Sequence, residues 1–174
     1  MNQEYWDIYD INKNKSGRRM KKDDWSLQPG DYHLTVLGAV KRGDGKYLIT
    51  KRKGNKSFAP GWWEIPGGGV MAGEESFGAV LREVKEETGL DVSSCEYELS
   101  HSYSRESDDG VNVITGDNYI VDTYTFFYDF DESEVKCQEE ETDGFMTATA
   151  EQIAELGRQG IFLHYNSIKS VFGF

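Results

Sequence analysis

Three glutamates have the spacing most suggestive of chemistry. Glu83, Glu86 and Glu87 stand at positions i, i+3 and i+4, which share one face of a helix. Like charges this close repel by roughly 0.2–0.5 kcal/mol per pair, so a helix that needed only solubility would scatter them. Converging carboxylate oxygens are what Mg²⁺ or Mn²⁺ requires, often together with substrate phosphates. The spacing therefore predicts a metal site, with a solvated acidic face as the alternative.

These glutamates belong to a longer pattern, G-x5-E-x7-R-E-hydrophobic-x-E-E-x-G-hydrophobic. Its slots are filled by Gly68, Glu74, Arg82, Glu83, Val84, Glu86, Glu87, Gly89 and Leu90. In every slot this resembles the signature box of the Nudix hydrolases. The resemblance implies hydrolysis of a pyrophosphate bond with bound Mg²⁺ or Mn²⁺, and it favours the metal site over the solvated face.

The resemblance also implies a role for each of four side chains. Glu83, Glu86 and Glu87 would hold metal, and one glutamate, either Glu83 or a residue from a later loop, would deprotonate the water. Arg82 would orient a box glutamate, since an arginine fork can hold a carboxylate in place. The catalytic candidates are Glu83, Arg82 and Glu86, and the choice of general base stays open.

Two further metal ligands are expected by position. The glycine just before the box, Gly67, would offer its carbonyl, although a plain turn is the alternative. A late-loop glutamate often completes the ligand set in this family, and the run Glu139 to Glu141 stands at about that place. Glu140 or Glu141 is the candidate, with Glu140 assigned as the ligand, and a solvated charge run is the alternative.

Substrate contacts are expected just before the box. Lys51 and Arg52 end a predicted strand and could meet a diphosphate, although strand-end cations are often surface charge. Of Trp62 and Trp63, we expect one in the core and one at the site, with Trp62 as the candidate. The substrate itself is not specified by any pattern in the loops.

The elements that would position these residues are read from periodicity. A helix should start near Glu74 or Ser76, bury Phe77, Val80, Leu81 and Val84, and end at Gly89. Strands are predicted at 4–10, 32–41, 46–52, 62–65, 94–104, 118–129 and 144–147, and later helices at 150–157, capped by Thr149, and at 163–172. The segments expected to lack strands are the turn at 12–17 with the basic connection after it, and the loops 54–61, 106–117 and 131–143.

These elements predict an α+β protein, an α/β/α sandwich in which a mixed β-sheet lies between helices. The Nudix resemblance implies the same fold. We expect an N-terminal β arm at residues 1–30 and a Nudix hydrolase domain at 31–174. The arm's strand could pair across a two-fold axis, so a homodimer is a further hypothesis.

Bulk composition narrows the partners. The chain has 174 residues and a net charge of −12, which disfavours duplex nucleic acid but allows a small phosphorylated metabolite beside bound metal. No apolar run reaches the roughly 20 residues of a membrane span, and the N-terminus does not resemble a signal peptide. Cys95 and Cys137 suggest reduced thiols. We therefore expect a cytoplasmic protein with no membrane partner.

Three functions compete. The box favours a metal-dependent hydrolase that cuts the pyrophosphate bond of a nucleoside diphosphate linked to another moiety. The opening EYWDIYD resembles the arm of the isopentenyl-diphosphate-isomerase-like branch of the superfamily, and with His33 it suggests an isomerase. The segment Pro60 to Gly69, where such an isomerase needs a cysteine, has none. A non-catalytic module that binds a nucleotide metabolite is the third function.

Overall fold

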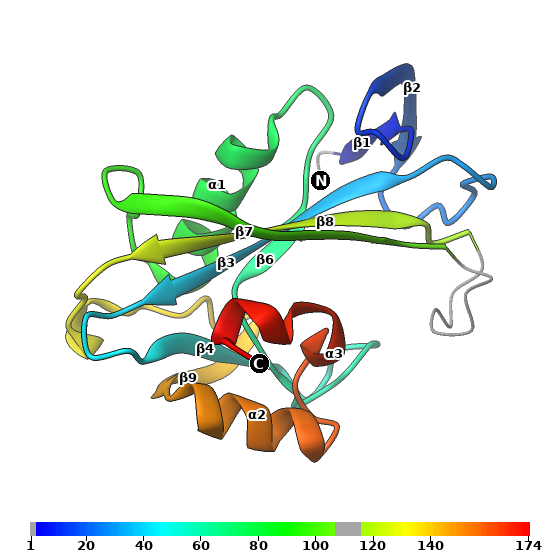
Figure 1. Cartoon of the computed structure of the whole chain (residues 1–174). Coiled ribbons are helices and arrows are strands. Elements are labelled where there is room, and N and C mark those ends of the chain that lie inside the picture. The colour runs from blue at the N-terminus through cyan, green and yellow to red at the C-terminus, as the bar shows by residue number, and fades with distance from the viewer. Residues whose placement is uncertain (1–2, 107–115) are drawn as a thin grey trace.

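A mixed β-sheet lies between one helix on its first face and two helices on the other (Figure 1). The computed structural model describes residues 3–106 and 116–174. Helix α1 (Ser76–Thr88) covers one face, and α2 (Ala150–Arg158) and α3 (Tyr165–Ile168) cover the other. The predicted α/β/α sandwich is therefore confirmed.

Strand β3 (His33–Lys41) joins the two halves of the sheet. It pairs in parallel with β8 (Tyr119–Phe127) and antiparallel with β6 (Gly67–Gly69) and β4 (Tyr47–Arg52). The remaining strands are β7 (Glu96–Arg105) on the outer side of β8, and β5 (Trp63–Glu64) and β9 (Thr142–Ala148), which both pair with β4. The apolar run of β3 suits a strand that is covered on both faces of the sheet.

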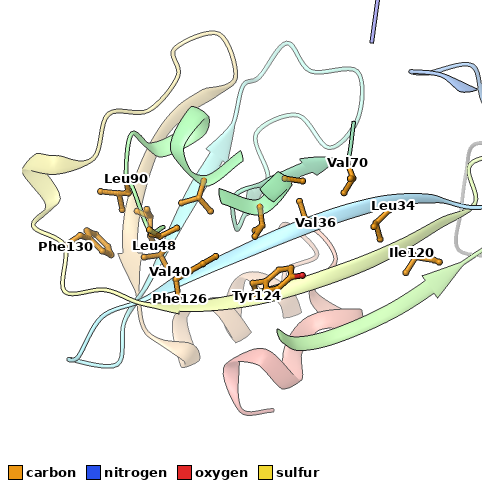
Figure 2. Close-up of a cluster of buried hydrophobic side chains, with 14 of the residues drawn as sticks. Leu34, Val36, Val40, Leu48, Val70, Leu90, Ile120, Tyr124, Phe126 and Phe130 are labelled. Atoms are coloured by element: carbon orange, nitrogen blue, oxygen red, sulfur yellow. The ribbon is translucent and has the colours of Figure 1, made fainter. Parts of the chain in front are cut away.

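Helix α1 packs on the sheet through the predicted apolar stripe. Val80 and Val84 are fully buried, and Phe77 and Leu81 are partly buried against the same cluster. Figure 2 shows the sheet side of this core, including Val36, Val40 and Phe126. A Cβ at Gly38 of β3 would stand 2.5 Å from a Val84 methyl group, so helix and strand are in close contact there. Gly89 ends the helix at φ 75°.

Helix α2 begins at the predicted cap. The Thr149 hydroxyl accepts from the Gln152 N–H at 3.2 Å, and the Gln152 side chain accepts from the Thr149 N–H at 2.8 Å. Such a capping box satisfies two amide donors that the first turn leaves unpaired. Ile153 is buried against the second face of the sheet, and Ala154 is buried as well. The late helix predicted at 163–172 is present as α3 followed by a 3₁₀ turn (Lys169–Phe172).

The N-terminal arm differs from its prediction. Strand β1 (Tyr5–Tyr9) was expected, but the segment expected to be a turn and a connection contains a second strand, β2 (Lys15–Lys21). Only Met20 of β2 is buried, so the strand carries no apolar alternation that a sequence could reveal. Within β1, Asp7 and Tyr9 are buried, as are Trp6 and Ile8, and only Tyr5 is exposed.

The loops follow their predictions in part. The 131–143 segment holds a 3₁₀ turn (Glu132–Glu134) capped by the Asp131 side chain, and its last two residues start β9. Most of the loop predicted at 106–117 lies outside the described residues. Among the residues that the structure describes, no helix combines the length and apolar character needed to cross a membrane.

Candidate active site

Glu87 has the most strongly shifted pKa of the carboxyl groups at the C-terminal end of α1. Its Oε2 is buried and has no hydrogen-bond partner in the structure. Burial raises the pKa of this carboxyl well above its ordinary value, and the negative charges of Glu64 and Glu83 raise it further. A backbone hydrogen bond from Gly67 opposes the shift. Glu87 therefore has a buried carboxylate oxygen with other negative charges beside it.

Glu83 lies one turn earlier and packs against Gly68 of β6. A Cβ at Gly68 would stand 2.5 Å from Glu83 Oε1 and 2.8 Å from Oε2, so only glycine leaves this carboxylate its place. Burial raises the pKa of Glu83, although the Arg82 guanidinium works in the opposite direction. The glycines Gly67 to Gly69 form strand β6 and not the plain turn that was the alternative for Gly67, and Gly68 leaves the space that Glu83 fills.

Arg82 holds the box together from its centre. Its Nε and Nη2 each donate to the Glu74 carboxylate at 2.9 Å, a bidentate pair. Its Nη1 donates to Glu83 at 2.6 Å and to Glu86 at 3.2 Å, and Nη2 reaches the Gly69 carbonyl at 3.2 Å. This geometry suits the orienting role expected from the sequence.

The carboxylates of Glu83, Glu86 and Glu87 are close enough to act on one another's pKa values. No three Asp, Glu, His or Cys side chains in the described ranges form a ready metal site. Both Glu83 and Glu86 are turned onto Arg82, and Glu86 is half exposed. The unpartnered oxygen of Glu87 and the raised pKa values of Glu83 and Glu87 nevertheless fit a divalent cation, which would remove the cost of three adjacent negative charges.

Glu64 on β5 is a site residue that the sequence analysis missed. Its carboxylate accepts from Arg52 Nη1 at 2.9 Å and 3.1 Å. Burial raises the pKa of Glu64, while the Arg52 charge lowers it, and Glu64 in turn acts on Glu87. The sequence feature that could have indicated Glu64 is its place on the short predicted strand 62–65, directly before the glycines of the box.

The late glutamate that reaches the site is Glu141. It lies near Glu64 and Glu87, whose pKa values it raises, and its carboxylate bonds to Lys56. Glu140, assigned as the ligand from sequence, is exposed. The Glu141 N–H donates to Gln138 and its carbonyl accepts from Lys53, so this turn directs Glu141 inward. Lys56 was also missed by the sequence analysis.

The residues predicted to contact substrate do not all lie on the same face of the sheet. Arg52 of β4 and Glu64 of the neighbouring strand β5 lie on the same face of the sheet and form an ion pair. Lys51, one residue earlier, projects to the opposite face and its Nζ lies 5.8 Å from the Trp63 ring centre. Trp63 packs against the buried cluster between the sheet and helices α2 and α3. Trp62 is half-buried and belongs to none of the hydrophobic clusters among the described residues. The structure thus brings Arg52, but not Lys51, to the carboxylates.

Gly67 is placed beside Glu87 by tight pairing with β3. A Cβ there would stand 2.2 Å from the Val36 carbonyl oxygen.

His33, which suggested an isomerase, is buried with its ring stacked on Trp6 at 4.4 Å and its Nε2 2.9 Å from Asp117. Its surroundings account for it as a packed core residue.

The chain is similar in sequence to known proteins. The family model described as the NUDIX domain matches residues 31–165. The chain is 28% identical over 172 residues to an uncharacterized Nudix hydrolase of Listeria monocytogenes, lmo0368, covering 97% of this chain and 94% of the relative. It is 42% identical over 55 residues to the nucleoside triphosphatase NudI of Salmonella agona, covering 32% of this chain and 39% of that protein.

Solved structures share the fold. DR0079 from Deinococcus radiodurans superimposes with a TM-score of 0.69 at 19% identity, over 89% of this chain and 90% of that one. The NUDIX domain of Shewanella oneidensis NrtR, complexed with ADP ribose, gives 0.59 at 18% identity, over 80% and 84%.

The family match covers most of the chain and includes the box, the buried carboxylates and the strands that hold them. The chain therefore belongs to the NUDIX domain family and is a Nudix hydrolase.

Proposed function

We propose that this protein hydrolyses the pyrophosphate bond of a nucleoside diphosphate linked to another moiety, using Mg²⁺ or Mn²⁺. The observation that carries the proposal is Glu87, a buried carboxylate with an unpartnered oxygen beside Glu64 and Glu83. Such an arrangement is costly without a cation and favourable with one.

The metal ligands are proposed from the same neighbourhood. Glu83, Glu86 and Glu87 would supply carboxylate oxygens and Gly67 its carbonyl. Glu141 replaces Glu140 as the late-loop ligand, because the charge of Glu141 acts on Glu87, whereas Glu140 is exposed. A bound divalent ion would polarise a phosphoryl oxygen and make a bound water more acidic.

The protein's own groups would do the rest. Glu83 is the proposed general base, because burial raises its pKa and so makes its carboxylate a better proton acceptor. Arg82 keeps that carboxylate in position through the 2.6 Å bond and is itself fixed by Glu74. Glu86, on the exposed side of Arg82, is a second catalytic candidate.

Substrate phosphates would meet the cations beside the carboxylates. Arg52 and Lys56 are held by Glu64 and Glu141, so both already face the site. The half-buried Trp62 is the candidate for contact with the organic part of the substrate. The substrate class is supported by the ADP ribose bound to the Shewanella domain and by a bifunctional NMN adenylyltransferase/ADP ribose pyrophosphatase from Francisella tularensis complexed with AMP and Mn (TM-score 0.60, 17% identity, 80% and 40% covered).

The proposal is tested by a panel of dinucleotides and nucleotide sugars with Mg²⁺ or Mn²⁺. Glu87→Gln keeps the shape of the side chain and removes its charge. We expect it to lose more than the roughly 100-fold that an outer-shell change costs. The matched control is Glu151→Gln, an exposed glutamate in the first turn of α2.

Unchanged turnover in Glu87→Gln would refute the metal-dependent mechanism. Tight nucleotide binding without turnover by the unaltered protein would favour the binding-module alternative. Formation of dimethylallyl diphosphate from the isomeric C5 diphosphate would favour the isomerase-like alternative. The division at residue 30, the cytoplasmic location and the homodimer stay predictions.

A further inference from the structure

The loop that joins β6 to α1 carries Glu74, on which the position of Arg82 depends. Its residues 70–75 are outside helix and strand. In Figure 1 the loop passes beside β1 of the N-terminal hairpin. Two of its amides donate to that hairpin: the Ala72 N–H to the Tyr5 carbonyl at 2.7 Å, and the Gly73 N–H to the Asp7 carboxylate at 2.8 Å.

We propose that the N-terminal hairpin is an intramolecular clamp on this loop, and that Asp7 is a positioning residue for the site. Asp7 would act through Gly73 on Glu74, which holds Arg82 and thereby Glu83. The inference rests on the proposed function for the identity of the reaction, while the contacts that carry it belong to the arm and the loop.

Asp7 is built to hold an amide. It is 8% exposed, and its Oδ1 accepts from Arg19 at 3.1 Å while its Oδ2 lies 3.5 Å from Lys15. Burial alone would raise the pKa of Asp7, but the Gly73 amide, Arg19 and Lys15 outweigh it and keep the pKa below its ordinary value. Asp7 is therefore an ionised, buried acceptor, and the N–H of Gly73 is the loop group that it binds.

The hairpin also contacts both ends of the loop. At the β6 end, a Cβ at Gly69 would lie 2.7 Å from the Trp6 indole, so the backbone lies directly on that ring. The Gly69 carbonyl accepts from Arg82 at 3.2 Å. At the α1 end, Lys15 Nζ reaches the Glu75 carboxylate at 2.9 Å and the Glu74 carbonyl at 3.4 Å.

These contacts form one short path from the arm to the proposed base. Trp6 and Asp7 fix the loop, the loop presents Glu74, and Glu74 binds two nitrogens of Arg82. Arg82 then holds Glu83 at 2.6 Å. Removing the Asp7 carboxylate should let the loop move and should loosen Arg82, without changing any group that contacts substrate.

The chain offers a matched control for a variant at Asp7. Asp31 also pairs with an arm arginine, Arg18, at 2.6 Å and 2.9 Å, and its side chain is nearly as buried as that of Asp7. The contacts of the Asp31 carboxylate are with the arm and do not include the loop at 70–75. Comparing Asp7→Ala with Asp31→Ala therefore separates clamping of the loop from general stability of the arm.

Three measurements on the full chain test the clamp. Mn²⁺ affinity of the free protein is read by electron paramagnetic resonance, amide exchange of the 70–75 loop by mass spectrometry, and kcat and KM with the best substrate. For Asp7→Ala we expect faster loop exchange, and Mn²⁺ affinity and kcat each lower by on the order of 10-fold with KM little changed. Asp31→Ala should change each by less than about twofold.

Asp7→Asn adds a rescue. It keeps an oxygen that can accept from Gly73 while losing the charge that attracts Arg19 and Lys15. We expect its Mn²⁺ affinity and kcat to recover most of the loss seen in Asp7→Ala. A purely electrostatic role would leave Asp7→Asn as impaired as Asp7→Ala and would overturn the assignment.

The clamp is refuted if Asp7→Ala matches Asp31→Ala in Mn²⁺ affinity and loop exchange. Should Asp7→Ala not fold, Lys15→Ala decides, since its side chain is more than a third exposed. It should lose roughly two- to fivefold in Mn²⁺ affinity, and unaltered affinity and exchange would overturn the clamp. Mn²⁺ binding and exchange need no substrate, so these results stand even if the unaltered protein turns over none of the panel, which would contradict the proposed function alone.

Discussion

Gly68→Ala tests the place of the Glu83 carboxylate with a single methyl group. The new Cβ would stand 2.5 Å, 2.6 Å and 2.8 Å from three atoms of that carboxylate, whereas ordinary contact begins at 3.4 Å. The carboxylate must therefore retreat by about 0.9 Å, the difference between the shortest approach and ordinary contact. Since Glu83 ends in a flexible side chain, it can yield without a shift of the backbone.

The result should separate activity from stability. A displacement near 1 Å of a reacting group costs about 100-fold in rate, equivalent to about 2.7 kcal/mol in the activation barrier. The free energy of unfolding should change by no more than about 1 kcal/mol, because the φ of Gly68 is not in the left-handed region and alanine restricts the unfolded chain. We expect kcat to fall while the melting temperature stays within a few degrees of its original value.

Two other glycines provide the comparison. Gly78 is exposed on α1 and a Cβ there meets nothing within 4 Å, so Gly78→Ala should leave kcat unchanged and stabilise the helix by about 1 kcal/mol. Gly67→Ala would press on the Val36 carbonyl at 2.2 Å, which is backbone, and should weaken the fold itself. The assay is phosphate release with Mg²⁺ beside a thermal melt. Original kcat and Mn²⁺ affinity in Gly68→Ala would refute the assigned position of Glu83.

Three further predictions concern other parts of the chain. Glu141→Gln should weaken Mn²⁺ binding by about 10-fold or more, and more than Glu140→Gln does, as measured by titration of the free protein. Thr149→Ala removes the α2 cap and should cost about 1 kcal/mol in chemical denaturation with kcat unchanged, while Thr149→Ser should restore it. Burial lowers the pKa of His164 to about 4, so the unfolded chain takes up a proton from pH 6.5 downward that the folded state refuses. The free energy of unfolding should therefore fall by up to about 2 kcal/mol between pH 8 and 5, and His164→Asn, compatible with its φ of 60°, should remove that loss.

Local patterns predicted the parts of the fold that local forces decide. The stripe of α1, its Gly89 end and the Thr149 cap were all readable, since each depends on residues within one or two turns. Strand β2 was not, because six of its seven residues are exposed and only Met20 reaches the small arm core. Its pairing with β1 is a tertiary choice that alternation does not record.

The site shows the same division. The box identified Arg82 and its glutamates, whose spacing along one helix brings them together. Glu64 and Lys56 come from elsewhere in the chain and meet the box only through the pairing of β4, β5 and β9. Within the run Glu139 to Glu141, charge alone could not select a member, whereas the backbone turn points Glu141 inward.

The parallel pairing of β3 with β8 has a consequence for how the chain folds during synthesis. His33 lies opposite Tyr119, and most of the domain is translated between the two. At about 5–20 residues per second, the ribosome needs roughly 4 to 17 seconds to deliver that partner after β3 has been made. Until then one edge of the most apolar strand lacks its longest neighbour, with only β4 and later β6 to pair with it. The nascent chain is thus most prone to aggregation before β8 emerges, and chaperone contact should concentrate in that interval.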